Sequence, residues 1–197
     1  MSQQEHVTGR VVFIGNSSVG KTSLIQRYLK GSDPKEQRST IGAVFHAHKA
    51  EVDGNSVSIQ IWDTAGQERY KALGPIYYRK ATAAVAVFDL TDQSSMYALD
   101  EWIRSFRDNA DGTKVFVAGN KSDLEGQISL TLAETITWAN QHGADCIWTS
   151  AVSGLGVDDL FSAVARYFLE EDVNIERNDK IIPVEEQPSV QKTNGCC

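Results

Sequence analysis

The sequence predicts an α/β protein with a six-stranded, mostly parallel sheet, one antiparallel hairpin strand and helices on both faces. Two observations lead to this fold class. Short apolar runs alternate along the chain with longer segments in which apolar residues recur every three or four positions. Two neighbouring runs, by contrast, flank Asp53-Gly54, a dipeptide typical of a two-residue hairpin turn.

The expected strand over 10–15 is a buried apolar run, and the one over 82–88 is almost wholly apolar. In chain order the expected strands are 10–15, 42–52, 57–62, 82–88, 115–119 and 147–150. Helices are expected over 21–30, around 99–106, over 131–142 and over 157–168, with a short one after residue 62. Over 21–30, 99–106 and 157–168 the apolar residues recur at helical spacing and share one face. Gly143 is expected to end the 131–142 helix.

The composition of the 197-residue chain excludes several classes of function. Its net charge of −7 argues against sequence-independent nucleic-acid binding, because such binding needs clustered Lys and Arg. No run approaches the roughly 18 apolar residues of a membrane helix, and no apolar segment follows a basic N-terminus as in a secretory signal. Three cysteines, Cys146, Cys196 and Cys197, make no disulfide framework, which indicates a reducing compartment.

Three segments are predicted: an N-terminal extension over 1–9, a ligand-binding domain over 10–171 and a flexible tail over 172–197. The tail has no aromatic residue and holds two of the chain's four prolines. Such a segment cannot bury enough apolar surface to order itself.

Residues 15–22, GNSSVGKT, match the phosphate-binding pattern G-x-x-x-x-G-K-[ST]. They follow an expected strand and open an expected helix, the context in which backbone N–H groups cradle phosphates. We expect Lys21 to reach the outer phosphates and the Thr22 hydroxyl to hold Mg²⁺. A strand–turn–helix with chance glycines is the plain alternative. The residues predicted to bind phosphate are Gly15, Ser17, Ser18, Val19, Gly20, Lys21, Thr22 and Ser23.

A second motif, N-K-x-D at 120–123, follows the expected strand over 115–119. Loops at the carboxyl ends of parallel strands are where α/β sheets bind ligands. The Asp123 carboxylate can accept two hydrogen bonds from guanine, whereas adenine offers no such donor pair. An ordinary polar loop is the alternative. With the loop at the end of the last strand, the predicted base-binding residues are Asn120, Lys121, Asp123, Ser150, Ala151 and Val152.

The end of the second hairpin strand carries residues suited to a metal ion and to hydrolysis. Asp63 can hold Mg²⁺ through water, Gly66 can bring its N–H to a terminal phosphate, and Gln67 can orient a water for in-line attack. Thr40, in the polar loop before the hairpin, can add a hydroxyl. The predicted metal-binding residues are therefore Thr22, Thr40 and Asp63, and the predicted catalytic residue is Gln67.

These motifs, in this order and spacing, resemble the Ras superfamily of small GTPases over residues 10–171. The segments 41–45, 63–70 and 77–79 are similar to signatures of its Rab branch, and 72–79 leans towards the endosomal Rabs. The resemblance implies a switch that binds GTP or GDP with Mg²⁺, hydrolyses GTP slowly without an activating protein, and recruits effectors in vesicle trafficking.

The resemblance also implies partners. Ile41, Phe45, Trp62 and Tyr77 would form the surface that effectors read, although burial in the core is the commoner fate of such aromatic side chains. An exchange factor, a GTPase-activating protein, the Rab escort protein and a GDP-dissociation inhibitor are the other implied partners. The expected protein is a monomer that binds no nucleic acid.

The last two residues, Cys196-Cys197, resemble the double-cysteine Rab terminus, in which both thiols carry geranylgeranyl groups. One lipid chain binds a membrane reversibly, whereas two anchor a protein stably. The implied location is the cytoplasmic face of an intracellular membrane, of endosomal type, with cycling through the cytosol.

Two positions depart from the Rab pattern. Lys80 stands where Rabs usually have glycine, and Asp33 stands where the family has an aromatic ring against the guanine. No aromatic residue lies between Leu29 and Val44, so a small shift of the alignment does not restore the ring. Because a carboxylate cannot stack on the base, we predict that nucleotide exchanges rapidly without a catalyst.

Two other functions are left open by the sequence. A P-loop kinase or ATPase is opposed by the N-K-x-D motif. A Rab-like scaffold that has lost nucleotide control is favoured by Asp33, but Lys21, Thr22, Thr40 and Gln67 oppose it.

Overall fold

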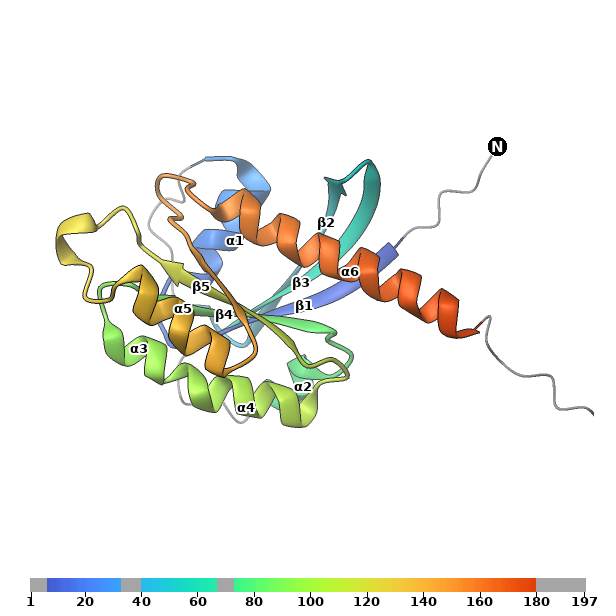
Figure 1. The fold of residues 1–197 in the computed structure, drawn as a ribbon, viewed down its shortest axis with the longest axis horizontal. Coiled ribbons are helices and arrows are strands. Elements are labelled where there is room, and N and C mark those ends of the chain that lie inside the picture. Colours follow the sequence, from blue (N-terminus) through green and yellow to red (C-terminus); the bar gives the residue numbers. More distant parts are fainter. Residues whose placement is uncertain (1–6, 33–39, 67–72, 180–197) are drawn as a thin grey trace, which may run out of the picture.

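The computed structural model describes residues 7–32, 40–66 and 73–179, with 172–179 described by their backbone. Six strands form one sheet in the order β2-β3-β1-β4-β5-β6, and helices cover both faces (Figure 1). The predicted fold class is confirmed. The strands are β1 (Val7–Ile14), β2 (Ala43–Val52), β3 (Asn55–Thr64), β4 (Ala83–Asp89), β5 (Lys114–Asn120) and β6 (Asp145–Trp148).

The helices connect these strands in the alternating order that the sequence predicts. They are α1 (Lys21–Lys30), α2 (Gly74–Tyr78), α3 (Gln93–Tyr97), α4 (Leu99–Asn109), α5 (Leu132–Gln141) and α6 (Val157–Asp179), with a 3₁₀ turn, η2, at Glu125–Gln127. Thr131 and Glu134 form a capping box at the start of α5. Gly143, with φ 59°, follows the end of α5 in the left-handed region, as predicted.

Five of the strands run in the same direction. β1 pairs in parallel with β3 and β4, β4 with β5, and β5 with β6, whereas β2 pairs antiparallel with β3. Phe13 therefore lies opposite Asp63, and Asp89 lies opposite Asn120. The carboxyl ends of the parallel strands meet at one edge, which brings the predicted motifs together.

Alternate residues of the central strands face two different apolar cores. Val11 and Phe13 face the core under α1 and α6, whereas Val12 and Ile14 face the core under α2, α3, α4 and α5. All seven residues of β4 are buried. Figure 1 shows α1 and α6 on one side of the sheet and the other helices on the opposite side. Burial on both faces explains why the central strands read as unbroken apolar runs.

The hairpin between β2 and β3 has the turn that its sequence predicts. Val52 pairs with Asn55, which leaves Asp53 and Gly54 as a two-residue loop. Their φ angles are 51° and 78°, and both central residues of a type I′ turn need positive φ. Arg166 of α6 donates from Nε to Asp53 Oδ2 over 2.9 Å, so the tip of the hairpin contacts the last helix.

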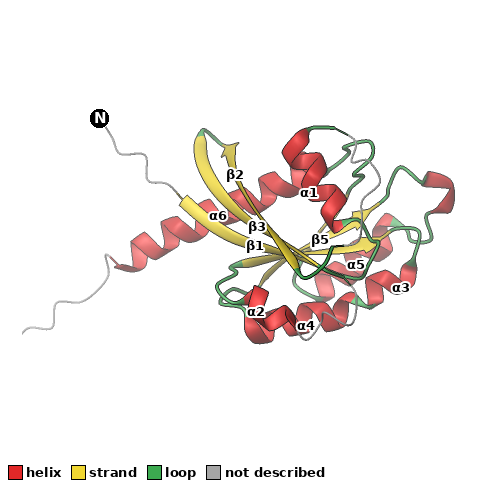
Figure 2. Ribbon diagram, turned by 180° about the vertical axis from the view of Figure 1, so that it is seen from behind, coloured by secondary structure: helices red, strands yellow, loops and turns green. Residues whose placement is uncertain are grey.

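The structure differs from the sequence prediction at two element boundaries. β6 begins at Asp145 and ends before Thr149, whose side chain belongs to the following loop. α6 continues to Asp179, past Glu171, where the tail was expected to begin. Neither glycine nor proline lies between residues 157 and 182, so no residue there breaks the helix. Figure 2 shows α6 projecting beyond the sheet.

Over residues 7–32, 40–66 and 73–179, none of the helices combines the length and the apolar character needed to cross a bilayer.

Lys80 provides a test of backbone strain. Its φ is 64°, in the left-handed region where a side chain costs about 1–2 kcal/mol. Glycine removes this cost but loses about 0.5–1 kcal/mol of chain entropy on folding. We therefore expect Lys80→Gly to raise the free energy of unfolding by about 0.5–1 kcal/mol in urea titrations. Lys80→Ala is the control, because it removes the long side chain and keeps the strain; a gain as large as that from glycine contradicts the strain argument.

Candidate functional site

The loop between β1 and α1 folds back over its own lysine. Lys21 is 6% exposed, and its Nζ donates to the carbonyl oxygens of Gly15, over 2.9 Å, and Asn16, over 2.8 Å. Burial lowers the pKa of Lys21 to about 8, although the nearby Asp63 carboxylate raises it. The ammonium thus lies at the carboxyl edge of the sheet with one of its three N–H donors left over.

Asn120 joins this loop to the loop after β6. Its side-chain nitrogen donates to the Val19 carbonyl over 2.9 Å, and its side-chain oxygen accepts from the Ala151 N–H over 3.3 Å. Gly20, with φ 98°, lies so close that a Cβ there would overlap the Asn120 amide. One buried amide therefore fixes two of the predicted loops against each other.

The three residues predicted to bind metal lie together. Thr22 Oγ1 donates to Asp63 Oδ2 over 2.7 Å, and Thr22 Oγ1 and Thr40 Oγ1 are 2.8 Å apart. Because Thr22 donates its hydroxyl hydrogen to the Asp63 carboxylate, Thr40 is the donor in the bond between the two threonines. The chain of three side chains connects the start of α1, the segment before β2 and the end of β3.

The chemistry of this cluster fits Mg²⁺. Two hydroxyls and a carboxylate are hard oxygen ligands of the kind that Mg²⁺ prefers. Asp63 Oδ1 is buried and has no hydrogen-bond partner. Burial raises the pKa of the Asp63 carboxyl, while the Thr22 hydrogen bond and the Lys21 charge lower it. A cation beside the unpartnered oxygen would satisfy it, with Thr22, Thr40 and Asp63 as its protein contacts.

Gly66 lies against the phosphate-binding loop. A Cβ at Gly66 would overlap both the Asn16 carbonyl oxygen and Lys21 Nζ, so a larger residue cannot take this position without moving the loop. Ala65, just before it, donates its N–H to the Gly42 carbonyl over 2.8 Å. The segment after β3 is therefore packed between the loop after β1 and the start of β2.

A cavity of about 260 Å³ lies beside the loop and contains most of the residues predicted to bind a base. Asp123 stands at this cavity and accepts a hydrogen bond from Ser150 Oγ over 2.5 Å. Its carboxylate is thus held in one orientation. The lining residues are Ser18, Gly20, Ser23, Asn120, Lys121, Asp123, Leu124, Ala151 and Val152.

Sequence reasoning missed Asp89, at the end of β4. Its Oδ2 forms an ion pair with Lys121 Nζ at 2.5 Å, and its Oδ1 accepts from the N–H and hydroxyl of Thr91. Burial alone would raise the pKa of Asp89, but the bonds from Lys121 and Thr91 outweigh it and lower the pKa. The position of Asp89 at a strand end was the signal available in the sequence.

Arg27 was missed as well. It lies on α1 and donates to the carbonyls of Val152, over 3.1 Å, and Ser153, over 2.9 Å. The helix that follows the phosphate-binding loop therefore also holds the loop after β6. A mid-helix arginine carries no sequence signal for such a contact.

Some predicted residues fall outside the described parts of the chain: Asp33, Gln67, Cys196 and Cys197. Among the others, Gly15 and Val19 are buried, Ser17 is exposed, and Ser18 is exposed and lines the cavity of about 260 Å³. Ser23, Ala151 and Val152 line the cavity of about 260 Å³.

The aromatic residues predicted to contact effectors are contiguous. The Phe45 and Trp62 ring centroids are 5.5 Å apart, and those of Trp62 and Tyr77 are 6.1 Å apart. Phe45 is 50% exposed and Ile41 is 76% exposed. Trp62 and Tyr77 are half-buried and pack on the core under α4. The row is thus exposed at its β2 end and packed on the core at its α2 end. The sequence left open whether these side chains form a surface or are buried in the core, and the structure shows part of each.

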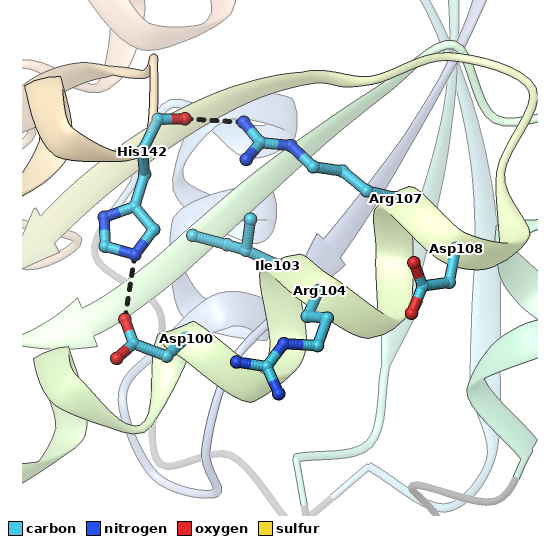
Figure 3. A pocket seen from close by; sticks show the side chains of 6 residues that line it. All are labelled: Asp100, Ile103, Arg104, Arg107, Asp108 and His142. Atoms are coloured by element: carbon cyan, nitrogen blue, oxygen red, sulfur yellow. Dashed lines mark hydrogen bonds and ion pairs between the residues drawn. The ribbon is translucent and has the colours of Figure 1, made fainter.

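A second cavity, of about 340 Å³, lies between α4 and the turn after α5 (Figure 3). Arg107 donates to the His142 carbonyl over 2.6 Å, and His142 Nε2 lies 2.9 Å from Asp100 Oδ1. The other lining residues are Ile103, Arg104 and Asp108. These bonds connect the walls of the cavity to each other, and its lining carries none of the predicted motifs.

Comparison with known proteins places these motifs in a family. Residues 10–170 match the Ras family. The chain is 38% identical over 161 residues to the Ras-related protein Rab-13 of Canis lupus familiaris, covering 81% of this chain and 79% of the relative. It is 37% identical over 169 residues to Rab5 of Nicotiana tabacum, covering 84% of each. It is 38% identical over 169 residues to Rab-21 of Geodia cydonium, covering 85% of this chain and 74% of the relative.

Proposed function

We propose that this chain, which belongs to the Ras family of small GTPases and is of the Rab type, is a GTP/GDP switch. Its proposed role is in intracellular vesicle trafficking. Like its family, it is an enzyme that hydrolyses GTP. Membership of this family decides against the kinase or ATPase alternative.

One observation carries the proposal. The hydroxyls of Thr22 and Thr40 and the carboxylate of Asp63 form one hydrogen-bonded chain, although they come from three separate segments. A Mg²⁺ ion held by these residues would neutralise phosphate charge and bind three segments at once. Loss of the terminal phosphate would then release Thr40 and Gly66, the two contacts that we assign to it, and change the surface beside them.

We assign each predicted residue a role on this basis. Lys21 and the backbone of 15–23 bind the phosphates, while Lys121 and Asp123, with the loop over 150–152, bind guanine. Gln67 orients the attacking water, and an activating protein accelerates the reaction. The support for the base site is that Ser150 orients the carboxylate of Asp123, which lines the cavity of about 260 Å³.

The proposed partners follow from the same assignment. Effectors bind the surface of Ile41, Phe45, Trp62 and Tyr77 in the GTP state, and an exchange factor reloads the protein. The escort protein delivers it for geranylgeranylation of Cys196 and Cys197, and a GDP-dissociation inhibitor extracts it. We place it on the cytoplasmic face of an intracellular membrane, of endosomal type.

Base selectivity tests the nucleotide assignment. Asp123→Asn replaces an acceptor pair by one acceptor and one donor, which suits xanthine, where a carbonyl takes the place of the guanine amine. We expect weaker binding of GTP and stronger binding of XTP in a competition assay. Asp158→Asn, an exposed carboxylate on α6, is the control and should leave both affinities unchanged. An unchanged guanine preference in Asp123→Asn rejects the base site.

Asp33 bears on the rate of exchange. Stacking of a base on an aromatic side chain contributes about 1–3 kcal/mol, so its loss corresponds to GDP release roughly 5- to 150-fold faster. We therefore expect Asp33→Phe to slow GDP release by a factor within that range and to raise the melting temperature of the GDP-bound protein. Stopped-flow or filter assays with labelled GDP measure the rate.

Asp33→Ala separates the missing ring from the carboxylate charge. It should slow GDP release less than Asp33→Phe does, because it removes the charge without adding a stacking surface. Equal rates for the wild type and Asp33→Phe contradict the stacking argument.

Membrane attachment tests the trafficking role. With both Cys196 and Cys197 changed to Ser, we expect the protein in the cytosolic fraction of cells, with its nucleotide affinity intact. Each single change should leave weaker, reversible attachment, because one lipid chain anchors poorly. If the doubly changed protein still binds membranes as the wild type does, the two cysteines are not the membrane anchor.

A further inference from the structure

We propose that Trp102 of α4 is a positioning residue for the phosphate-binding loop, acting through the side chain of Asn16. The inference rests on the proposed nucleotide site. Trp102 Nε1 donates to Asn16 Oδ1 over 3.0 Å, across 86 positions of sequence. The indole N–H is a donor only, so Asn16 must turn its carbonyl oxygen towards α4.

Asn16 contacts both Lys21 and Gly66 through its backbone carbonyl. Its backbone carbonyl accepts from Lys21 Nζ over 2.8 Å. Gly66 packs against the same carbonyl so closely that a Cβ would overlap it. The orientation of this one peptide group therefore sets where the ammonium of Lys21 and the backbone of Gly66 can lie, and the Trp102 bond restrains that orientation from the side-chain end.

Trp102 is a rigid support. Its side chain is 3% exposed and belongs to the core cluster between the sheet and α4, together with Val12, Ile14 and Leu99. A loop held by a packed side chain of a helix is positioned more accurately than a loop held by its own backbone. Gly15 also lies close to Leu99 of α4, and Asn16 adds to that packing a directed side-chain hydrogen bond from α4 to the loop.

The bond to Trp102 does not compete with the nucleotide. Trp102 is not among the residues that line the cavity of about 260 Å³, and its partner is the side chain of Asn16 rather than a backbone N–H of the loop. Lys21, in contrast, uses two of its three donors on the loop carbonyls, and phosphate competes for them. The Trp102 bond is thus the restraint on Asn16 that persists when phosphate binds.

The consequence is a measurable effect on GDP release. Trp102→Phe keeps an aromatic ring in the core and removes the N–H donor, and Asn16→Ala removes the acceptor. A hydrogen bond of ordinary strength corresponds to GDP dissociation about 2- to 10-fold faster in each variant, in the presence of Mg²⁺. Because both changes remove the same bond, the double variant should release GDP no faster than the faster single variant.

Trp148→Phe is the matched control. Trp148 Nε1 donates to Thr135 Oγ1 over the same 3.0 Å, and its side chain packs on the same core cluster. This variant should lose a similar amount of unfolding free energy in urea and leave the GDP dissociation rate within about twofold of the wild type. The comparison separates positioning of the loop from general destabilisation.

The experiment measures dissociation of a fluorescent GDP analogue from the full-length protein for the wild type, the three single variants and the double variant. Wild-type rates in Trp102→Phe and Asn16→Ala, additive effects in the double variant, or equal acceleration by Trp148→Phe would each overturn the inference. Asn16→Ala lies in a loop, so it supplies the answer if Trp102→Phe does not fold. A wild-type protein that binds no GDP would instead overturn the proposed function itself.

Discussion

Burial of a charged lysine at the carboxyl edge of the sheet is the constraint on which the rest of the site depends. An ammonium is expensive to remove from water, and the lowered pKa of Lys21, about 8, reflects that cost. Two loop carbonyls accept hydrogen bonds from the Lys21 ammonium, and the Asp63 carboxylate attracts its charge. The loop must wrap around the ammonium to bring those carbonyls close, and the tight approach of Gly66 follows from the same geometry.

The parallel sheet turns this local constraint into a site. Because β1, β3, β4 and β5 end at one edge, short polar loops meet there without long connections. Asn120 then fixes the loop after β1 to the loop after β6, and Asp89 fixes Lys121. Buried polar groups with satisfied partners hold the loops in one arrangement, and such preorganisation lowers the ordering cost of binding a ligand.

The sequence predicts the parts of this arrangement that depend on local pattern. The hairpin at Asp53-Gly54 and the phosphate-binding loop were found because turn chemistry and glycine spacing are local properties. Contacts such as Trp102 with Asn16 or Asp89 with Lys121 join distant residues of ordinary type, so no pattern within one segment reveals them. The length of α6 was also missed, since a polar composition does not prevent a helix that is anchored at its start by Leu160 and Phe161.

The two hairpin strands provide a physical link between the proposed metal site and the proposed effector surface. Side chains alternate between the faces of a strand, so Asp63 faces the site while its neighbour Trp62 faces the aromatic row. Phe45, on the antiparallel strand β2, is the register partner of Trp62. It lies five residues after Thr40, which belongs to the hydroxyl and carboxylate cluster. A shift of Thr40 or Asp63 therefore moves the backbone that carries these rings. Because Trp62 is supported by the core and Phe45 is not, we infer that the exposed end of the row changes more between nucleotide states.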